Sequence, residues 1–183
     1  GFIKKAKHLG VRYLYQEVVE ILREGNRIEG VKTKDGTRYS SSLIVNAAGP
    51  YAGEVGKMAG VEIPVVPLRR MVYLVRPPRL FEYDLPLTID PSGVYFLHET
   101  GRQILTGKSR KEEPVGFNFS WDRQYFQEEI WSSLAHRIPL LNELKLIRGW
   151  AGLYEVNQWD FNGIIGRHPE VSGFFMAVGF SGH

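Results

Sequence analysis

The sequence contains no cysteine, which excludes a disulfide framework, a thiol nucleophile, a thiolate metal site and a cysteine-linked cofactor within this chain. No apolar run approaches the ~18 residues that a membrane span requires, so we expect a protein without a membrane span. The opening residues 1–6 also lack the apolar centre of a secretory signal. These absences favour a cytoplasmic protein, or a mitochondrial one if the source is eukaryotic.

A strong charge of one sign is also lacking. The 23 Lys and Arg residues are nearly balanced by 20 Asp and Glu residues, which gives a net charge of +3. No nucleic-acid-binding module accompanies the basic clusters, so we expect no nucleic-acid partner. The five histidines are dispersed and no pair of them has metal-ligand spacing with a carboxylate, so we expect no metal site.

The residues that are present predict a globular protein rich in strands and poor in helices. Hydrophobic residues make up 43% of the chain and aromatic residues 13%. The clearest helix is predicted over 121–138, where apolar residues recur every four positions and Pro139 ends the pattern. The fold class expected from this order is α+β. The expected strands are 11–14, 18–22, 28–33, 43–48, 65–75, 94–97, 103–106, 145–156, 162–166 and 174–178.

Two of these strands end in glycine. The segment 43–48 runs into Gly49-Pro50, and the five apolar residues 174–178 run into Gly179-Phe180-Ser181-Gly182-His183. An unbroken apolar run predicts a strand buried on both faces. A glycine turn after such a strand leaves backbone N–H groups free to bind a ligand.

The last five residues partly match the G-x-S-x-G motif of serine hydrolases. His183 stands at the position of the second glycine, and the motif requires a helix after the serine that the sequence does not supply. A serine hydrolase is therefore not favoured. The usual dinucleotide-binding motif, G-x-G-x-x-G after a strand, is also absent.

Four segments together carry a resemblance: 43–50, 150–154, 162–166 and 179–183. In this combination the chain resembles the D-amino-acid-oxidase-like FAD-dependent oxidoreductases, a family that includes enzymes oxidising glycine, sarcosine and dimethylglycine. The resemblance implies FAD as cofactor and a small amine or amino acid as substrate. It also implies oxidation of the substrate C–N bond by hydride transfer to the flavin, with hydrolysis of the resulting imine by water.

The resemblance assigns roles to particular residues. Val18 would meet the adenine, and Tyr154 and His183 are the catalytic candidates, with the Tyr154 phenol facing the substrate. The strand end at Ala47 and Gly49 would pass the FAD, and the terminal loop would lie against its isoalloxazine ring. The cofactor-binding candidates are Val18, Ala47, Ala48, Gly49, Gly179, Phe180, Ser181, Gly182 and His183.

A domain division follows from the same resemblance. Residues 1–62 would form part of a Rossmann-like FAD-binding domain without its N-terminal βαβ unit, and 63–156 a substrate domain with a mixed, mostly antiparallel sheet. Residues 157–183 would return to the FAD-binding domain and end at the flavin loop. The chain would then be an internal fragment of a longer flavoenzyme, inactive and without FAD by itself.

Two further expectations concern association and the alternatives to catalysis. Strands 43–48 and 174–178 would be left partly uncovered, which predicts a homodimer formed through exposed strands. The alternative to an enzyme is a non-catalytic, flavoprotein-like assembly or scaffold factor. A globular α+β domain that binds nothing is the third possibility.

Overall fold

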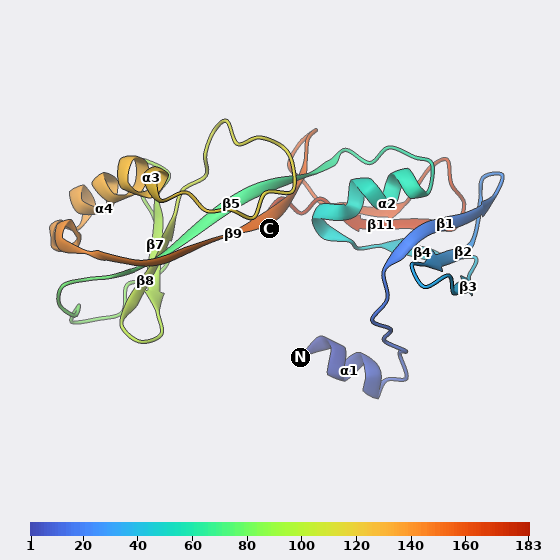
Figure 1. Ribbon diagram of the computed structural model, residues 1–183, viewed down its shortest axis with the longest axis horizontal. Coiled ribbons are helices and arrows are strands. Elements are labelled where there is room, and N and C mark those ends of the chain that lie inside the picture. The colour runs from blue at the N-terminus through green and yellow to red at the C-terminus, as the bar shows by residue number, and fades with distance from the viewer.

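The computed structural model of the chain describes residues 1–183 and contains two sheet-rich halves joined by two long strands, β5 and β9 (Figure 1). The elements, in chain order, are α1 (Phe2–His8), β1 (Val18–Glu24), β2 (Arg27–Thr33), β3 (Arg38–Ser40), β4 (Ile44–Asn46), the 3-10 turn η1 (Gly49–Tyr51), α2 (Ala52–Met58), β5 (Val65–Arg76), β6 (Thr88–Ile89), β7 (Tyr95–Glu99), β8 (Gln103–Gly107), α3 (Arg123–Tyr125), the π-helical turn η2 (Phe126–Trp131), α4 (Ser132–Arg137), the 3-10 turn η3 (Pro139–Glu143), β9 (Lys145–Asn157), β10 (Ile164–Arg167) and β11 (Phe174–Val178).

One half is a five-stranded sheet in the order β6-β7-β8-β5-β9, covered on one face by the α3–η2–α4 helical segment (Figure 1). Every neighbouring pair in this sheet is antiparallel. The helical segment buries Phe126, Ile130 and Leu134 against it. Fully burying such a side chain stabilises the fold by about 1.5–3 kcal/mol. The segment begins with Asp122, whose side chain accepts a hydrogen bond from the Tyr125 amide at 3.1 Å.

The other half combines two small sheets with helix α2. Strands β1, β2 and β3 form an antiparallel meander, and a second sheet has the order β10-β11-β4. Its central strand β11 is antiparallel to β10 and parallel to β4. A separate core connects these elements and includes Ile21, Ala52, Phe174 and Val178. The two halves therefore have one hydrophobic core each.

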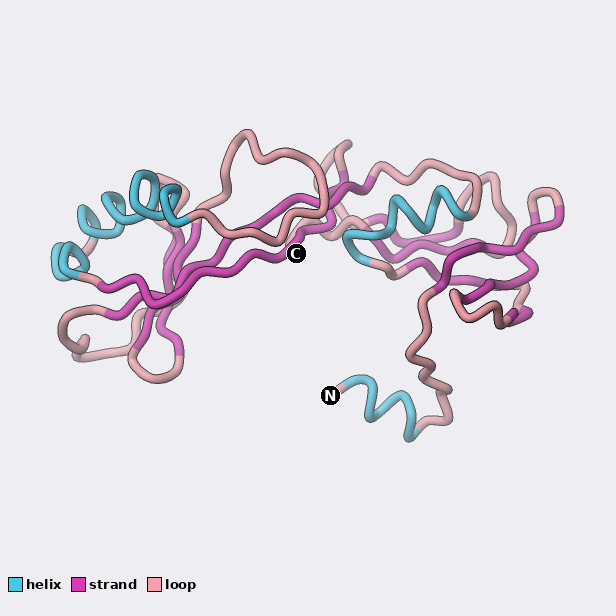
Figure 2. The backbone as a smooth tube through the Cα atoms, in the orientation of Figure 1, coloured by secondary structure: helices cyan, strands magenta, loops and turns pink.

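The long strands β5 and β9 connect the two halves. They are paired along nearly their whole length, from Val65 opposite Asn157 to Arg76 opposite Lys145. In Figure 2 this pair runs along the long axis of the molecule, from the helical segment towards α2. The end of β9 and the loop after β11 consequently meet between the halves, where the C-terminus lies (Figure 1).

The observed fold confirms the α+β class and the expected strands except 11–14, which lies in the irregular segment between α1 and β1. Two further details differ. The sheet of the predicted substrate domain is antiparallel throughout, and the mixed sheet is the small one that contains β4 and β11. The prediction that 174–178 is buried on both faces is wrong for one face. Phe174 and Met176 pack into the core under α2, whereas Phe175 and Ala177, on the other face of the strand, are only half-buried.

Helix α1 projects away from both halves and buries none of its residues (Figure 1). Gly10 ends it with a φ of +88°, a backbone conformation that favours glycine. None of the helices has the length and apolar character that crossing a bilayer requires.

Candidate functional site

The two glycine-terminated strands predicted from the sequence lie side by side. Strands β4 and β11 are parallel neighbours, with Asn46 opposite Met176. Their carboxyl ends therefore reach the same edge of the sheet, and the residues that follow, 47–49 and 179–182, emerge there together. In open sheets with parallel strands, ligands bind outside the carboxyl ends of the strands. This edge is the candidate cofactor site.

The turn after β4 is organised by the buried side chain of Asn46. Its Nδ2 donates to the carbonyl of Ala52 at 3.0 Å, and its Oδ1 accepts from the amide of Ala48 at 3.2 Å. Gly49 has a φ of +55°, and an added Cβ would meet no atom within 4 Å. The turn is thus fixed by its own hydrogen bonds while the space beside Gly49 stays open.

The loop after β11 is held by the end of β9. Glu155 accepts two hydrogen bonds from it, one at its carboxylate from the Gly179 amide (2.9 Å) and one at its carbonyl from the Ser181 amide (3.0 Å). The Asn157 amide donates to Ser181 Oγ at 3.1 Å, and that hydroxyl donates to the Gly179 carbonyl at 3.1 Å. The Ser181 hydroxyl therefore has a structural role in the loop.

The expectation of free N–H groups in this loop is wrong for three of its residues. The amides of Gly179 and Ser181 donate to Glu155, and the amide of His183 donates to the carbonyl of Phe180 at 2.8 Å. Only the amides of Phe180 and Gly182 make no hydrogen bond within the chain. Two donors, rather than a full row of them, are available at this edge.

The backbone conformation of the loop is constrained. Gly179, Ser181 and Gly182 have φ values of +75°, +54° and +98°. Gly182 lies directly against the Tyr154 ring, so that a Cβ at this position would overlap the ring. The loop predicted to contact flavin and the tyrosine predicted to contact substrate are therefore packed together.

Tyr154 lies on the face of the five-stranded sheet that the helices leave uncovered. It stands on β9 opposite Leu68, and its side chain is 40% exposed. The Arg70 guanidinium carbon lies 5.1 Å from the centre of its ring. Tyr95 stands on β7, and burial, with a smaller contribution from Tyr154, raises the pKa of its phenol. The phenols of Tyr154 and Tyr95 and the guanidinium of Arg70 thus lie on this face.

The remaining predicted residues lie as follows. Val18 is the first residue of β1, half-buried and paired with Thr33 in the meander, a different sheet from the glycine-terminated strands. Ala47 is exposed, and Ala48 is half-buried. His183 is exposed, and only its backbone is hydrogen-bonded within the chain. The assignments of Val18 to adenine and of His183 to catalysis stay predictions.

Sequence reasoning did not select Asn46, Arg70, Glu155 or Asn157 as site residues. Asn157 is buried, and its Nδ2 donates to Asp160 Oδ1 and to the Asn162 carbonyl, both at 2.8 Å, which fixes the turn towards β10. For Asn46 the sequence does contain a signal of a site residue, because a polar side chain stands there at the end of an apolar strand. Asn157 is likewise a polar residue at the end of a strand, and its side-chain contacts are local. No local signal marked Arg70 or Glu155, because their contacts with Tyr154 and Gly179 join distant parts of the chain.

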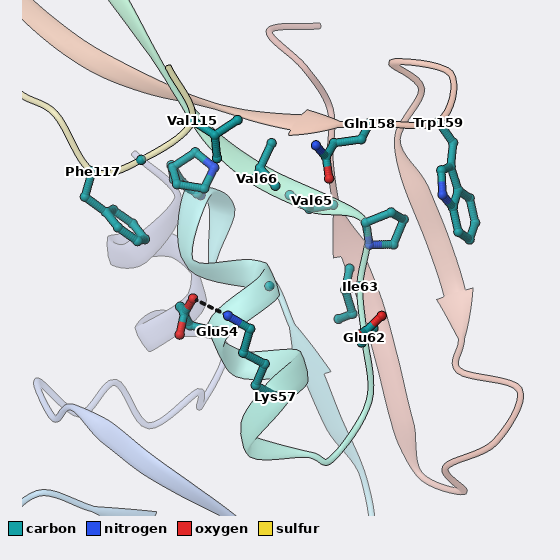
Figure 3. A pocket seen from close by; sticks show the side chains of 15 residues that line it. Glu54, Lys57, Glu62, Ile63, Val65, Val66, Val115, Phe117, Gln158 and Trp159 are labelled. Carbon is teal, nitrogen blue, oxygen red and sulfur yellow. Dashed lines mark hydrogen bonds and ion pairs between the residues drawn. The ribbon is translucent and has the colours of Figure 1, made fainter. Parts of the chain in front are cut away.

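A cavity of about 500 Å³ lies beside this region, between α2, the start of β5 and the segment at Gln158 and Trp159 (Figure 3). Its polar groups include the ion pair of Glu54 and Lys57, whose charged atoms are 3.0 Å apart. None of the residues predicted to bind flavin or substrate lines it. No group of three or more His, Asp or Glu side chains is placed to bind a metal ion.

The chain belongs to a family of flavoproteins. Residues 1–183 match the family described as FAD dependent oxidoreductase, whose members depend on FAD. This membership confirms the resemblance found in the sequence and the fold class. The residues at the strand edge are compatible with a bound FAD, because two unbonded amides and the open space beside Gly49 follow strands whose carboxyl ends reach the same edge of the sheet.

Three comparisons illustrate the relationship. The chain is 42% identical to FAD-dependent oxidoreductase domain-containing protein 1 of Xenopus laevis, over 78% of this chain and 31% of that protein. It is 32% identical to glycine oxidase of Pseudomonas aeruginosa, over 75% of this chain and 36% of that enzyme. The crystal structure of L-proline dehydrogenase from P. horikoshii superposes with a TM-score of 0.87 at 31% identity, over 100% of this chain and 49% of that one. The chain thus spans less than half the length of each of these proteins.

Proposed function

We propose that this chain is the substrate-binding part, with a portion of the FAD-binding part, of an enzyme that oxidises the C–N bond of a small amine or amino acid. The observation that carries the proposal is the meeting of the two glycine-terminated strand ends beside the face that bears Tyr154. Glycine oxidase and L-proline dehydrogenase among the similar proteins support this class of substrate. Substrates related to glycine, sarcosine or dimethylglycine are the ones we expect.

Each part of the chain has a role in this proposal. The chemistry that FAD supplies when bound is acceptance of a hydride from the carbon next to the substrate nitrogen, which leaves an imine for hydrolysis by water. The amides of Phe180 and Gly182 would hold the flavin side, and Tyr154 would orient the substrate by a hydrogen bond from its phenol. The packing of Gly182 against Tyr154 would fix the distance between the two.

The proposed domain division follows the two cores except at the start of the substrate-binding portion, where Ile63 and Val65 pack in the core of the other half. The FAD-binding portion comprises 1–62 and 157–183, and the substrate-binding portion comprises 63–156. Strand β4 lies at an edge of its sheet and exposes Val45, which supports the proposed homodimer. Strand β11 lies between β10 and β4, so it has no free edge with which to pair with a second chain.

Steady-state turnover with an artificial dye as electron acceptor tests the function. The FAD-loaded protein that contains this chain should reduce the dye with at least one of glycine, sarcosine, dimethylglycine and proline, and should release the carbonyl product of imine hydrolysis. A protein that binds FAD but oxidises none of a broad panel of amines and amino acids would instead support a non-catalytic assembly factor.

A further inference from the structure

The turn between β9 and β10 presents two aromatic side chains to solvent. Trp159 is 80% exposed and Phe161 is 59% exposed. The backbone of the turn is nevertheless fixed by the buried residue Asn157. Its Oδ1 accepts a hydrogen bond from the Trp159 amide at 3.1 Å, and its carbonyl accepts one from the Phe161 amide at 3.1 Å. The turn therefore holds two large apolar side chains in defined positions on the surface.

Phe161 also has a strained backbone. Its φ of +62° lies in the left-handed region, which bulky side chains rarely occupy. Its side chain belongs to neither hydrophobic core, so the fold gains little from a phenylalanine at this position. Strained residues are found most often where a protein uses them for function. The exposed ring thus indicates a contact with a group outside the chain.

Trp159 borders the cavity of about 500 Å³ beside α2, and the apolar surface continues on the other side of that cavity. Figure 3 shows the side chains of Phe117 and Trp159 at opposite ends, with Val65 and Val66 between them. Phe117 is exposed, and its ring stacks on that of Tyr51 with 4.5 Å between the centroids. Contiguous exposed apolar surface rimmed by polar groups marks an interaction site.

The charged groups at this surface are mostly negative. Three charged side chains line the cavity, and two of them, Glu54 and Lys57, pair with each other at 3.0 Å. The third, Glu62, is exposed and forms no ion pair within the chain. Asp160 adds a carboxylate between the two exposed rings of the turn. Three carboxylates against one ammonium make this surface negative, although the whole chain has a net charge of +3.

The chemistry of a fitting partner follows from these two properties. An arginine or lysine can place its cation over an exposed tryptophan ring and pair with a carboxylate at the same time. An aliphatic side chain beside it would enter the cavity, whose volume is in the range of ligand pockets. Nucleic acids and anionic membranes are disfavoured, because the carboxylates repel their phosphate groups.

We propose that this part of the molecule is a docking surface for a segment of a partner protein in which basic side chains alternate with apolar ones. The docking surface is defined by Tyr51, Glu62, Phe117, Trp159, Asp160 and Phe161. The inference goes beyond the function proposed above and does not depend on it, since none of these residues is assigned to FAD or to substrate.

A synthetic peptide tests the docking surface in the full-length protein that contains this chain. A fluorescein-labelled peptide of alternating arginine and leucine should bind saturably in fluorescence anisotropy, with a Kd that rises with salt. Replacing arginine by glutamate, or leucine by serine, should weaken binding by about tenfold or more. Trp159→Ala should raise the Kd by about tenfold or more, because it removes the central ring. Glu62→Gln should raise it by about two- to fivefold.

Glu82 and Tyr83 provide the matched control. They are an exposed carboxylate and an exposed aromatic ring in the segment between β5 and β6, in the other half of the molecule. Glu82→Gln and Tyr83→Ala remove the same kinds of group and should leave the Kd of the peptide unchanged. Equal losses of affinity in these two variants would show unspecific attraction and would overturn the proposal.

Phe161→Asn separates binding from folding. Asparagine tolerates the left-handed conformation, so we expect the free energy of unfolding to be retained while the Kd of the peptide rises. Denaturant unfolding and anisotropy on the same preparation measure the two quantities. A less stable variant with unchanged peptide affinity would assign the ring to the fold and overturn its place in the docking surface.

Access to Trp159 tests whether the docking surface is free in the full-length protein. The difference in emission between the wild type and Trp159→Ala reports this side chain. Acrylamide should quench it in the free protein and should quench it less once the peptide is bound. A docking surface already covered by another segment of the same protein, or by a second copy, would give neither quenching nor peptide binding and would overturn the proposal.

Discussion

The carboxylate of Glu155 accepts a hydrogen bond from the amide of Gly179 at 2.9 Å, across 24 residues of sequence. This bond joins the last residues of the sheet that bears Tyr154 to the first residue of the loop that we assign to the flavin. The carbonyl of Glu155 also accepts from Ser181, so the loop is fixed from β9 by protein groups alone. A preformed loop loses little conformational entropy when a ligand binds.

Removing the Glu155 carboxylate should loosen this loop. We expect Glu155→Ala to lower the free energy of unfolding by about 1–3 kcal/mol, because the Gly179 amide loses its partner, whereas Glu155→Gln retains an acceptor and should cost less. Denaturant unfolding measures both variants. Glu82→Ala, at an exposed position, is the control and should leave stability unchanged. Equal stability of Glu155→Ala and the wild type would show that the hydrogen bond does not hold the loop.

Gly182 should tolerate no side chain. Its φ of +98° and its contact with the Tyr154 ring mean that Gly182→Ala must displace either the loop or the ring. We expect weaker FAD binding and a lower kcat/KM in the complete protein. Gly152→Ala is the matched control, since its added methyl group has open space, and it should bind FAD normally. Normal FAD affinity in Gly182→Ala would argue against the assigned loop.

Tyr154→Phe removes only a hydroxyl and keeps the ring that packs against Gly182. Because losing one hydrogen bond costs about 0.5–1.5 kcal/mol, kcat/KM should fall by up to about tenfold while the FAD content stays unchanged. Steady-state kinetics and flavin stoichiometry on the same preparation check this expectation. Unaltered kinetics would remove the phenol from the substrate site.

The buried ion pair of Arg69 and Glu113 should matter far more for stability than an exposed pair. Their side chains are 8% and 2% exposed, so Glu113→Ala would leave the Arg69 charge buried and should cost about 3 kcal/mol or more. The exposed pair of Lys57 and Glu54 is the control, and Glu54→Ala should cost less than about 1 kcal/mol. Similar losses in the two variants, measured by denaturant unfolding, would contradict this ranking.

Local patterns in the sequence were sufficient to predict most of the strands, the helical segment and the two glycine-terminated strand ends, but not the short strand β6. The four-residue spacing of Phe126, Ile130 and Leu134 predicted the face that packs on the sheet. The contacts between the elements could not be predicted in this way. Arg70 meets Tyr154 because of the register between β5 and β9, and Glu155 meets Gly179 because β9 ends beside β11. Neither relationship leaves a local trace in the sequence.

Anaerobic mixing of the FAD-loaded protein with one amino acid at a time tests the central claim most directly. We expect the visible absorbance band of oxidised flavin to disappear with at least one of glycine, sarcosine, dimethylglycine and proline, with one carbonyl product formed per flavin reduced. The rate of bleaching should rise with substrate concentration and then saturate, as binding to a defined site requires. A flavin that stays oxidised with every amino acid and amine tested would contradict the account.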